Sequence, residues 1–214
     1  MQDLLKFMDE FIRNDFVRFH NEDAAMDESD ALPAIAGINM NRQDRVDRLH
    51  RWLNYYGVLR FKGSGNKKAA EAILNFAAAL PCGTPLTRQK LMDEYARLES
   101  MVKQCVPENK SGEARSITSL TSKALWCCYP HDVPIYDRNA RCALQVLCRL
   151  LHINIDVPEE NYEAFADAWF QVYEHLKPVI DSADIAPYLY KVRVLDSFLW
   201  YLGDPKFDKR EAES

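Results

Sequence analysis

The sequence predicts an all-α fold of about eight helices. Apolar residues recur at the three-to-four-residue spacing of amphipathic helices along most of the chain. Only seven glycines occur in 214 residues, strand-like alternation is scarce and no internal repeat is present. With 48% apolar residues, the chain is long enough to bury one sizeable core. These observations together favour helix packing on helix over any sheet architecture.

The amino-terminal part of the chain is predicted to be an acidic helix followed by a connector. Residues 2–20 place apolar side chains at helical spacing, and the connector runs to residue 40. A helical domain is expected over 41–203, and a flexible tail over 204–214. The first helix of this domain opens near Asn41, where Asp44 follows three positions later, as in a capping box.

Two further helices are expected before the middle of the chain. The alanine-rich segment 67–80 stops at Pro81. Thr84 and Pro85 form a typical N-cap and first-turn pair for a helix over 86–105.

Four more helices are expected in the second half. They are predicted over 119–129 and 138–151, from Pro158 onward, and over 187–202. Asp137 is a suitable N-cap for the second of these four helices.

The net charge of −5 is unevenly distributed along the chain. Residues 1–40 and residues 157–214 each carry a net charge of −6, whereas residues 41–156 carry +7. A basic centre between acidic flanks is compatible with a surface that faces nucleic acid. The alternative is the ordinary fluctuation of surface charge along a chain.

Several classes of protein are disfavoured by composition. No apolar run approaches the length of a membrane span, and the amino terminus lacks a signal-peptide pattern. The six cysteines contain no C-x-x-C pair, so we interpret them as reduced residues of a cytoplasmic protein. Neither a metal site nor a cofactor is predicted, and no membrane partner is expected.

A basic, glycine-bearing loop is predicted over residues 60–68. Lys62, Lys67 and Lys68 in this loop are candidates for contact with a nucleic-acid backbone. The loop does not match a P-loop in glycine spacing or in its ending. The alternative interpretation is a solvated surface loop.

The stretch 119–137 carries the main candidate for chemistry. A helix over its first eleven residues would be roughly 16 Å long, at about 1.5 Å per residue. Pro130 and Pro134 end this helix and hold the next segment extended. Seven residues span at most about 25 Å, which is enough to return Asp137 to the neighbourhood of Lys123. A primary amine beside a carboxylate is the minimum equipment for covalent attack on a sugar carbon.

Two motifs in this region resemble the helix-hairpin-helix DNA glycosylases. Residues 117–123, Ile-Thr-Ser-Leu-Thr-Ser-Lys, look like a degenerate form of the hairpin Leu-Pro-Gly-Val-Gly-x-Lys. Residues 133–137, Val-Pro-Ile-Tyr-Asp, resemble Val-Pro-Val-Asp, whose aspartate is catalytic in that family. The pattern is most similar to the bacterial 8-oxoguanine-glycosylase-like proteins, some of them from defence loci. Motif agreement covers about residues 115–143, with a weaker echo at 190–201.

The resemblance implies a mechanism and a partner. The chain would bind double-stranded DNA and flip an oxidised or modified purine, such as 8-oxoguanine, into a pocket. Lys123 would attack the anomeric carbon, and Asp137 would stabilise the developing sugar cation. The resulting imine would permit AP lyase cleavage. A role in DNA repair or antiviral defence follows by the same analogy.

Other residues are candidates for contacts with this substrate. Ser119 and Thr121 stand where the hairpin normally has glycines, and their hydroxyls are candidates for a DNA phosphate. Four residues are candidates for substrate binding: Trp126, Tyr136, Arg138 and Arg141. The alternatives are core positions for the two aromatic residues and surface positions for the two arginines.

Two other functions remain open from the sequence. One is a catalytically inactive helical module that binds nucleic acid or a partner protein on a glycosylase scaffold. The replaced hairpin glycines and the acidic ends of the chain favour it. The other is a glycosidase that acts on a free nucleotide or on RNA.

Overall fold

The structure, a computed structural model, contains helices and no strand within the residues that it describes. The predicted all-α fold is therefore confirmed. The described residues are 2–16, 30–37, 39–55, 65–80, 86–105, 116–183 and 190–204. Contacts between residues divide the chain into two compact units. The middle unit is Glu22–Val133, and the terminal unit combines Met1–Asn21 with Pro134–Ser214.

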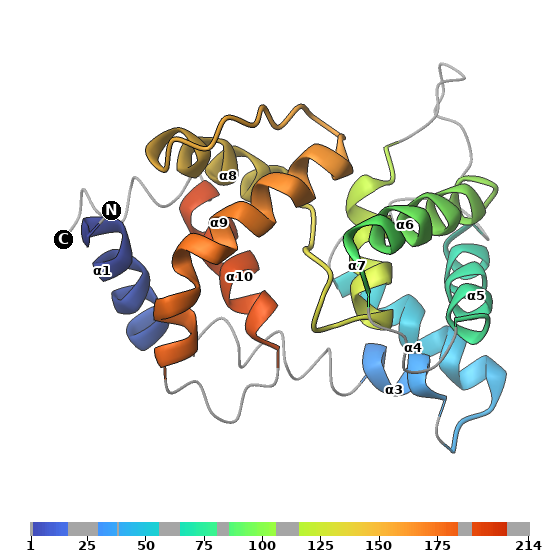
Figure 1. The fold of residues 1–214 in the computed structure, drawn as a ribbon. Helices are drawn as coiled ribbons and strands as arrows, with labels where there is room; N and C mark the ends of the chain where they lie inside the picture. The colour runs from blue at the N-terminus through green and yellow to red at the C-terminus, as the bar shows by residue number, and fades with distance from the viewer. Residues whose placement is uncertain are drawn as a thin grey trace. The chain divides into compact units, whose positions relative to one another are not determined.

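Five helices form the described part of the middle unit (Figure 1). They are α3 (Leu32–Ala36), α4 (Arg42–Tyr55), α5 (Gly65–Ala78), α6 (Arg88–Lys103) and α7 (Thr118–Cys128). Helix α7 packs against α3 and α6, and nine of its eleven residues are buried. Trp126 of α7 stacks on Trp52 of α4, with ring centroids 6.4 Å apart and planes 10° apart. A helix that is covered on nearly all sides forms the core of its unit.

N-caps were predicted at Asn41 for the helix that is α4 and at Thr84 for the helix that is α6. The Asp44 amide donates to the Asn41 side chain at 2.9 Å, so the cap predicted at Asn41 is confirmed. Helix α6 begins at Arg88, because Thr87 accepts a hydrogen bond from the Lys90 amide at 3.3 Å. The helix therefore starts later than the predicted 86, and the predicted cap at Thr84 and Pro85 lies outside the described ranges. Thr87 fits the same local rule, that a cap accepts from the amide three residues later.

The terminal unit contains four α-helices and one π-helical turn within its described residues (Figure 1). They are α1 (Gln2–Phe11), η1 (Ile12–Phe16), α8 (Arg138–Leu150), α9 (Tyr162–Ser182) and α10 (Lys191–Gly203). Helix α10 packs on α8 and on α9. Phe11 of α1 lies 5.2 Å from the ring of Phe198 on α10. The predicted helix over 2–20 thus widens into a π-helical turn at Ile12, and residues 17–20 lie outside the described ranges.

Helices α8 and α10 approach closely where α10 ends. A Cβ atom placed on Gly203 would overlap the carbonyl group of Asn139, in the first turn of α8. Only a residue without a side chain permits this approach. The close contact fixes the amino-terminal end of α8, which is the end that carries Asp137.

The start of α9 also differs from the prediction. The helix begins at Tyr162 instead of Pro158, because Asn161 accepts a hydrogen bond from the Ala164 amide at 3.0 Å. Asparagine is among the strongest N-caps, which explains why the helix starts there. The last helix begins at Lys191, and residues 184–189 lie outside the described ranges.

The two units do not follow the order of the chain. The segments predicted from composition were 1–40, 41–203 and 204–214, whereas the contacts divide the chain after residues 21 and 133. The terminal unit brings the first and the last parts of the sequence together through packing of α1 on α9. Patterns that are read along the sequence do not reveal such long-range pairings. The predicted tail falls on residues outside the described ranges, apart from Asp204.

Candidate functional site

Lys123 lies in the middle of α7 with its side chain enclosed in the middle unit. The residue is only 6% exposed. Its amine donates a long hydrogen bond of 3.5 Å to the hydroxyl of Ser119, one helical turn earlier. Lysine is almost never buried unless it is paired. A buried amine that is directed at a hydroxyl is therefore a candidate for chemistry.

Asp137 caps the amino-terminal end of α8 in the terminal unit. Its carboxylate accepts a hydrogen bond from the Asn139 amide at 2.8 Å, which confirms the predicted cap. The carboxylate is half-buried and lies at the positive end of the helix dipole, where a negative charge is favoured. Its direction is set by the backbone of α8.

The segment that leads into Asp137 is held by side-chain hydrogen bonds. The Tyr162 hydroxyl donates to the Pro134 carbonyl at 2.9 Å. The Glu160 amide donates to the Tyr136 hydroxyl at 2.9 Å. These contacts hold an extended segment against α9 and the turn that precedes it.

Asp196 of α10 holds the same segment from another helix. Its carboxylate accepts from the Ile135 amide at 3.3 Å and from the Trp169 indole at 2.9 Å. Arg193 lies 3.8 Å from it as an ion-pair partner. Sequence reasoning included Asp196 only in the weak echo at 190–201. An arginine and an aspartate three positions apart within an otherwise apolar helix were the signal that could have singled it out.

Lys123 and Asp137 belong to different units. The chain passes from the middle unit to the terminal unit between Val133 and Pro134. The amine and the carboxylate are each fixed within their own unit by the contacts described above. That the two groups share one pocket stays a prediction.

The two aromatic candidates fill the interiors of their units. Trp126 is fully buried against Trp52. Tyr136 is 5% exposed, and its ring meets Phe165 edge-on at 5.1 Å. Burial raises the pKa of the Tyr136 hydroxyl. Both residues have the core positions that were the alternative interpretation, and their roles toward a base stay predictions.

The two arginines after Asp137 differ in their surroundings. Arg141 donates to the Val157 carbonyl at 3.0 Å, which holds the segment between α8 and α9. Arg138 is exposed at the first residue of α8. Of the two arginines, Arg138 is therefore the one that faces solvent.

The hydroxyls expected to meet a phosphate lie in the first turns of α7. Ser119 is half-buried and accepts from Lys123, whereas Thr121 is fully buried. Both residues are helical instead of lying in a turn. Of the hairpin predicted over 117–123, residues 118–123 belong to α7, so the hairpin is not confirmed.

The predicted basic loop is described only at its end. Helix α5 begins at Gly65, so Lys67 and Lys68 lie in its first turn. Both side chains are exposed there. Lys67 forms an ion pair with Asp47 of α4 at 3.1 Å. Lys62 lies outside the described residues.

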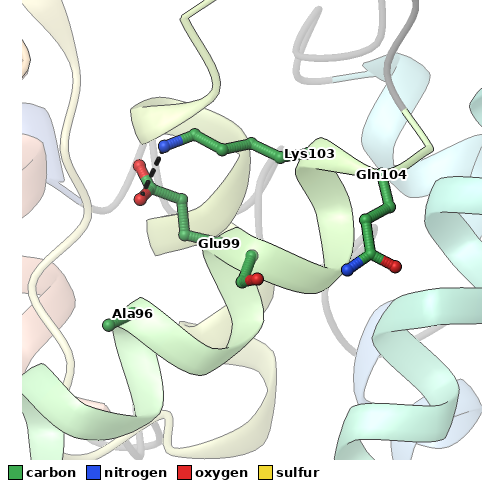
Figure 2. Close-up of a pocket in the computed structure, with 5 residues that line it drawn as sticks. Ala96, Glu99, Lys103 and Gln104 are labelled. Carbon is green, nitrogen blue, oxygen red and sulfur yellow. Dashed lines mark ion pairs between the residues drawn. The ribbon is translucent and has the colours of Figure 1, made fainter.

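A shallow pocket of about 440 Å³ lies along α6 (Figure 2). Its described lining residues belong to this helix and to its carboxyl-terminal cap, Gln104, and Lys103 in its wall is ion-paired with Glu99 at 2.9 Å. None of the predicted site residues that the structure describes is among them. The pocket therefore adds nothing to the chemistry of Lys123 or Asp137.

Two other features are absent from the described residues. No group of three or more histidine, cysteine or acidic side chains is arranged there to hold a metal ion. Within the same ranges, no helix combines the length and the apolar content needed to cross a bilayer.

The chain was compared with family models, with curated proteins and with solved structures. None of the three comparisons found a match.

Proposed function

We propose that this protein is a DNA N-glycosylase with associated AP lyase activity, acting on an oxidised or modified purine such as 8-oxoguanine. The observation that carries the proposal is the buried amine of Lys123. A lysine amine that the protein encloses and directs at a neighbouring hydroxyl is held in place for attack on carbon. The motif resemblance over residues 115–143 supplies the reaction class.

The proposed reaction begins with attack of the Lys123 amine on C1′ of the flipped nucleotide. The new C–N bond forms as the glycosidic bond breaks, and the base leaves with the bonding electron pair and takes up a proton. Loss of the amine proton and opening of the sugar ring give an imine. Elimination of the 3′ phosphate then cleaves the strand, and water hydrolyses the imine to release the lysine.

Asp137 has an electrostatic role in this proposal. As the base departs, positive charge develops on the sugar, and a carboxylate of fixed direction stabilises it without reorganising. The cap bond to Asn139 supplies that fixed direction. The mechanism requires Lys123 and Asp137 to reach the same sugar.

Borohydride trapping tests the proposal. Borohydride reduces the imine to a stable amine, so incubation with an oligonucleotide that carries 8-oxoguanine or an abasic site should yield a covalent protein–DNA adduct. Peptide mapping should place that adduct on Lys123, and Lys123→Gln should abolish it. Lys103→Gln is the matched control, because Lys103 is an exposed lysine on a neighbouring helix. Absence of an adduct with the unmodified chain would contradict the proposal.

One observation favours a non-catalytic nucleic-acid or protein-binding module instead. Thr121 is fully buried, so one of the two hydroxyls that replace the hairpin glycines does not face solvent. The same experiment separates the two functions. Salt-dependent binding of the oligonucleotide without trapping would support the module, and release of base from mononucleotides alone would indicate a nucleotide glycosidase.

A further inference from the structure

One peptide group next to the candidate site is hydrogen-bonded to side chains on both of its polar atoms. The carbonyl of Pro134 and the amide of Ile135 belong to the same peptide plane. The carbonyl accepts from the Tyr162 hydroxyl at 2.9 Å, and the amide donates to the Asp196 carboxylate at 3.3 Å. Tyr162 lies on α9 and Asp196 on α10. Two different helices therefore fix the orientation of a single peptide.

The carboxylate in this arrangement is costly to bury. Asp196 is only 4% exposed, and burial of a charge disfavours folding unless donors compensate for the lost water. The donors are the Trp169 indole at 2.9 Å, the Ile135 amide and, at 3.8 Å, Arg193. Apolar residues of similar size often replace such buried pairs without loss of stability. Packing alone therefore does not explain an aspartate here.

The fixed peptide lies two residues before Asp137. Its two polar atoms, the Pro134 carbonyl and the Ile135 amide, are both held, and the ring of Pro134 restricts the φ angle before it. Beyond it, Asp137 enters α8 through its cap bond to Asn139. The peptide and the cap together leave the backbone on both sides of Asp137 with a defined direction.

We propose that Asp196 and Tyr162 are positioning residues for Asp137, and that they act by holding the peptide between Pro134 and Ile135. This inference rests on the proposed function, because it assigns the two residues to the orientation of the carboxylate that stabilises the sugar cation. Neither residue touches the reacting atoms in this assignment. Each acts through the backbone, at a site where small displacements reduce the reaction rate strongly.

The test compares Asp196→Asn and Tyr162→Phe in the full chain. Asparagine retains one acceptor oxygen but turns an NH₂ group toward donors, and phenylalanine removes only the hydroxyl. Tyr162→Phe is the milder change and protects the test against misfolding of the Asp196 variant. Tyr173→Phe is the matched control, because Tyr173 lies on the same helix and stacks on Trp169.

Two measurements are made on each variant. The first is hydrogen exchange of the Ile135 and Asn139 amides, with the Leu144 amide as an internal reference. The second is the single-turnover rate of borohydride trapping on an abasic-site oligonucleotide at saturating DNA. We expect Ile135 exchange to accelerate and trapping to slow, each by about tenfold, in both test variants. DNA affinity, Leu144 exchange and the control variant should stay as in the unmodified chain.

The possible failures are distinguishable. If the unmodified chain forms no adduct, the proposed function fails and this inference fails with it. If it forms the adduct and both test variants trap at the unmodified rate, the inference alone is overturned. It is also overturned if the variants trap slowly while Ile135 exchange is unchanged, because the loss would then not pass through that peptide.

Discussion

The amine of Lys123 lies 3.5 Å from the hydroxyl oxygen of Ser119, one turn earlier on α7. Ser119 occupies a position where the resemblance leads one to expect a hairpin glycine that lies against DNA. Its oxygen instead accepts a hydrogen bond from the proposed nucleophile. Ser119 therefore restricts the directions that the amine can take, which is a different role from contact with a phosphate.

Replacing Ser119 with alanine should slow the trapping of an abasic-site oligonucleotide by about tenfold, because the amine loses the hydrogen bond to the Ser119 hydroxyl that orients it. Binding of the oligonucleotide should be unchanged. Ser122→Ala is the control, since Ser122 lies on the same helix and its hydroxyl donates to the Ser119 carbonyl. A loss of DNA affinity with an unchanged salt dependence would show that Ser119 contacts a phosphate, because a neutral hydroxyl displaces no counterion.

Asp137 caps α8 and, in the proposed mechanism, stabilises the sugar cation. Substitution separates these two roles. Asp137→Asn keeps an oxygen that can accept from the Asn139 amide, so we expect little change in the free energy of unfolding. Asp137→Ala removes the cap and should cost about 1 kcal/mol. Both variants lack the carboxylate, so base excision should fall strongly in both. Urea unfolding and the excision rate measure the two effects, and full excision by Asp137→Asn would exclude an electrostatic role.

The sequence predicted local features better than long-range ones. The cap at Asp137 and the start of α4 at Asn41 depend on residues within three positions, and both were confirmed. The role of Asp196 was not predicted, because its partners Ile135 and Trp169 lie 61 and 27 positions away.

The division into units was also hidden from the sequence. It joins the two ends of the chain, and no local pattern indicates this. The pattern indicated Thr84 as the cap of α6, whereas Thr87, which fits the same local rule, caps this helix. The motif resemblance identified Lys123 and Asp137, but it gave no indication that Ser119 would accept from the amine.

Gly203→Ala should destabilise the terminal unit by about 3 kcal/mol or more, because a Cβ there would overlap the Asn139 carbonyl and the backbone would have to move. Ser197→Ala, on the same helix and at a partly exposed position, should change the free energy of unfolding by less than about 0.5 kcal/mol. Chemical denaturation measures both. Equal stability of the two variants would show that α10 and α8 are not held at this distance in solution.

His152 occupies the position at the end of α8 where glycine is usual. Its φ angle is +56°, and the Ile153 amide donates to the Cys148 carbonyl at 2.8 Å, as in a Schellman motif. His152→Gly should therefore stabilise the protein by about 0.5–1 kcal/mol, since glycine adopts this conformation without strain. The same change at His175, inside α9, should have the opposite sign. Thermal unfolding measures both, and a loss of stability in His152→Gly would contradict the motif.

The thiol of Cys128 makes stability depend on pH. Burial, with a further contribution from Glu94, raises the pKa of this thiol from 9.0 to about 12. In the unfolded chain the thiol ionises near pH 9, whereas in the folded chain it stays neutral. The stability that it contributes is therefore fully present below pH 9 and is lost as the pH rises from 9 toward 12.

At pH 10 this effect should lower the free energy of unfolding by about 1 kcal/mol relative to pH 8. A serine at position 128 does not ionise in this range, so the stability of Cys128→Ser should fall less between the two pH values. Cys142→Ser removes an exposed thiol and should follow the unmodified chain. Urea unfolding at pH 8, 9 and 10 compares the three proteins. If the free energy of unfolding falls equally with pH in Cys128→Ser and in the unmodified chain, folding does not keep the Cys128 thiol from ionising. That result would contradict the prediction.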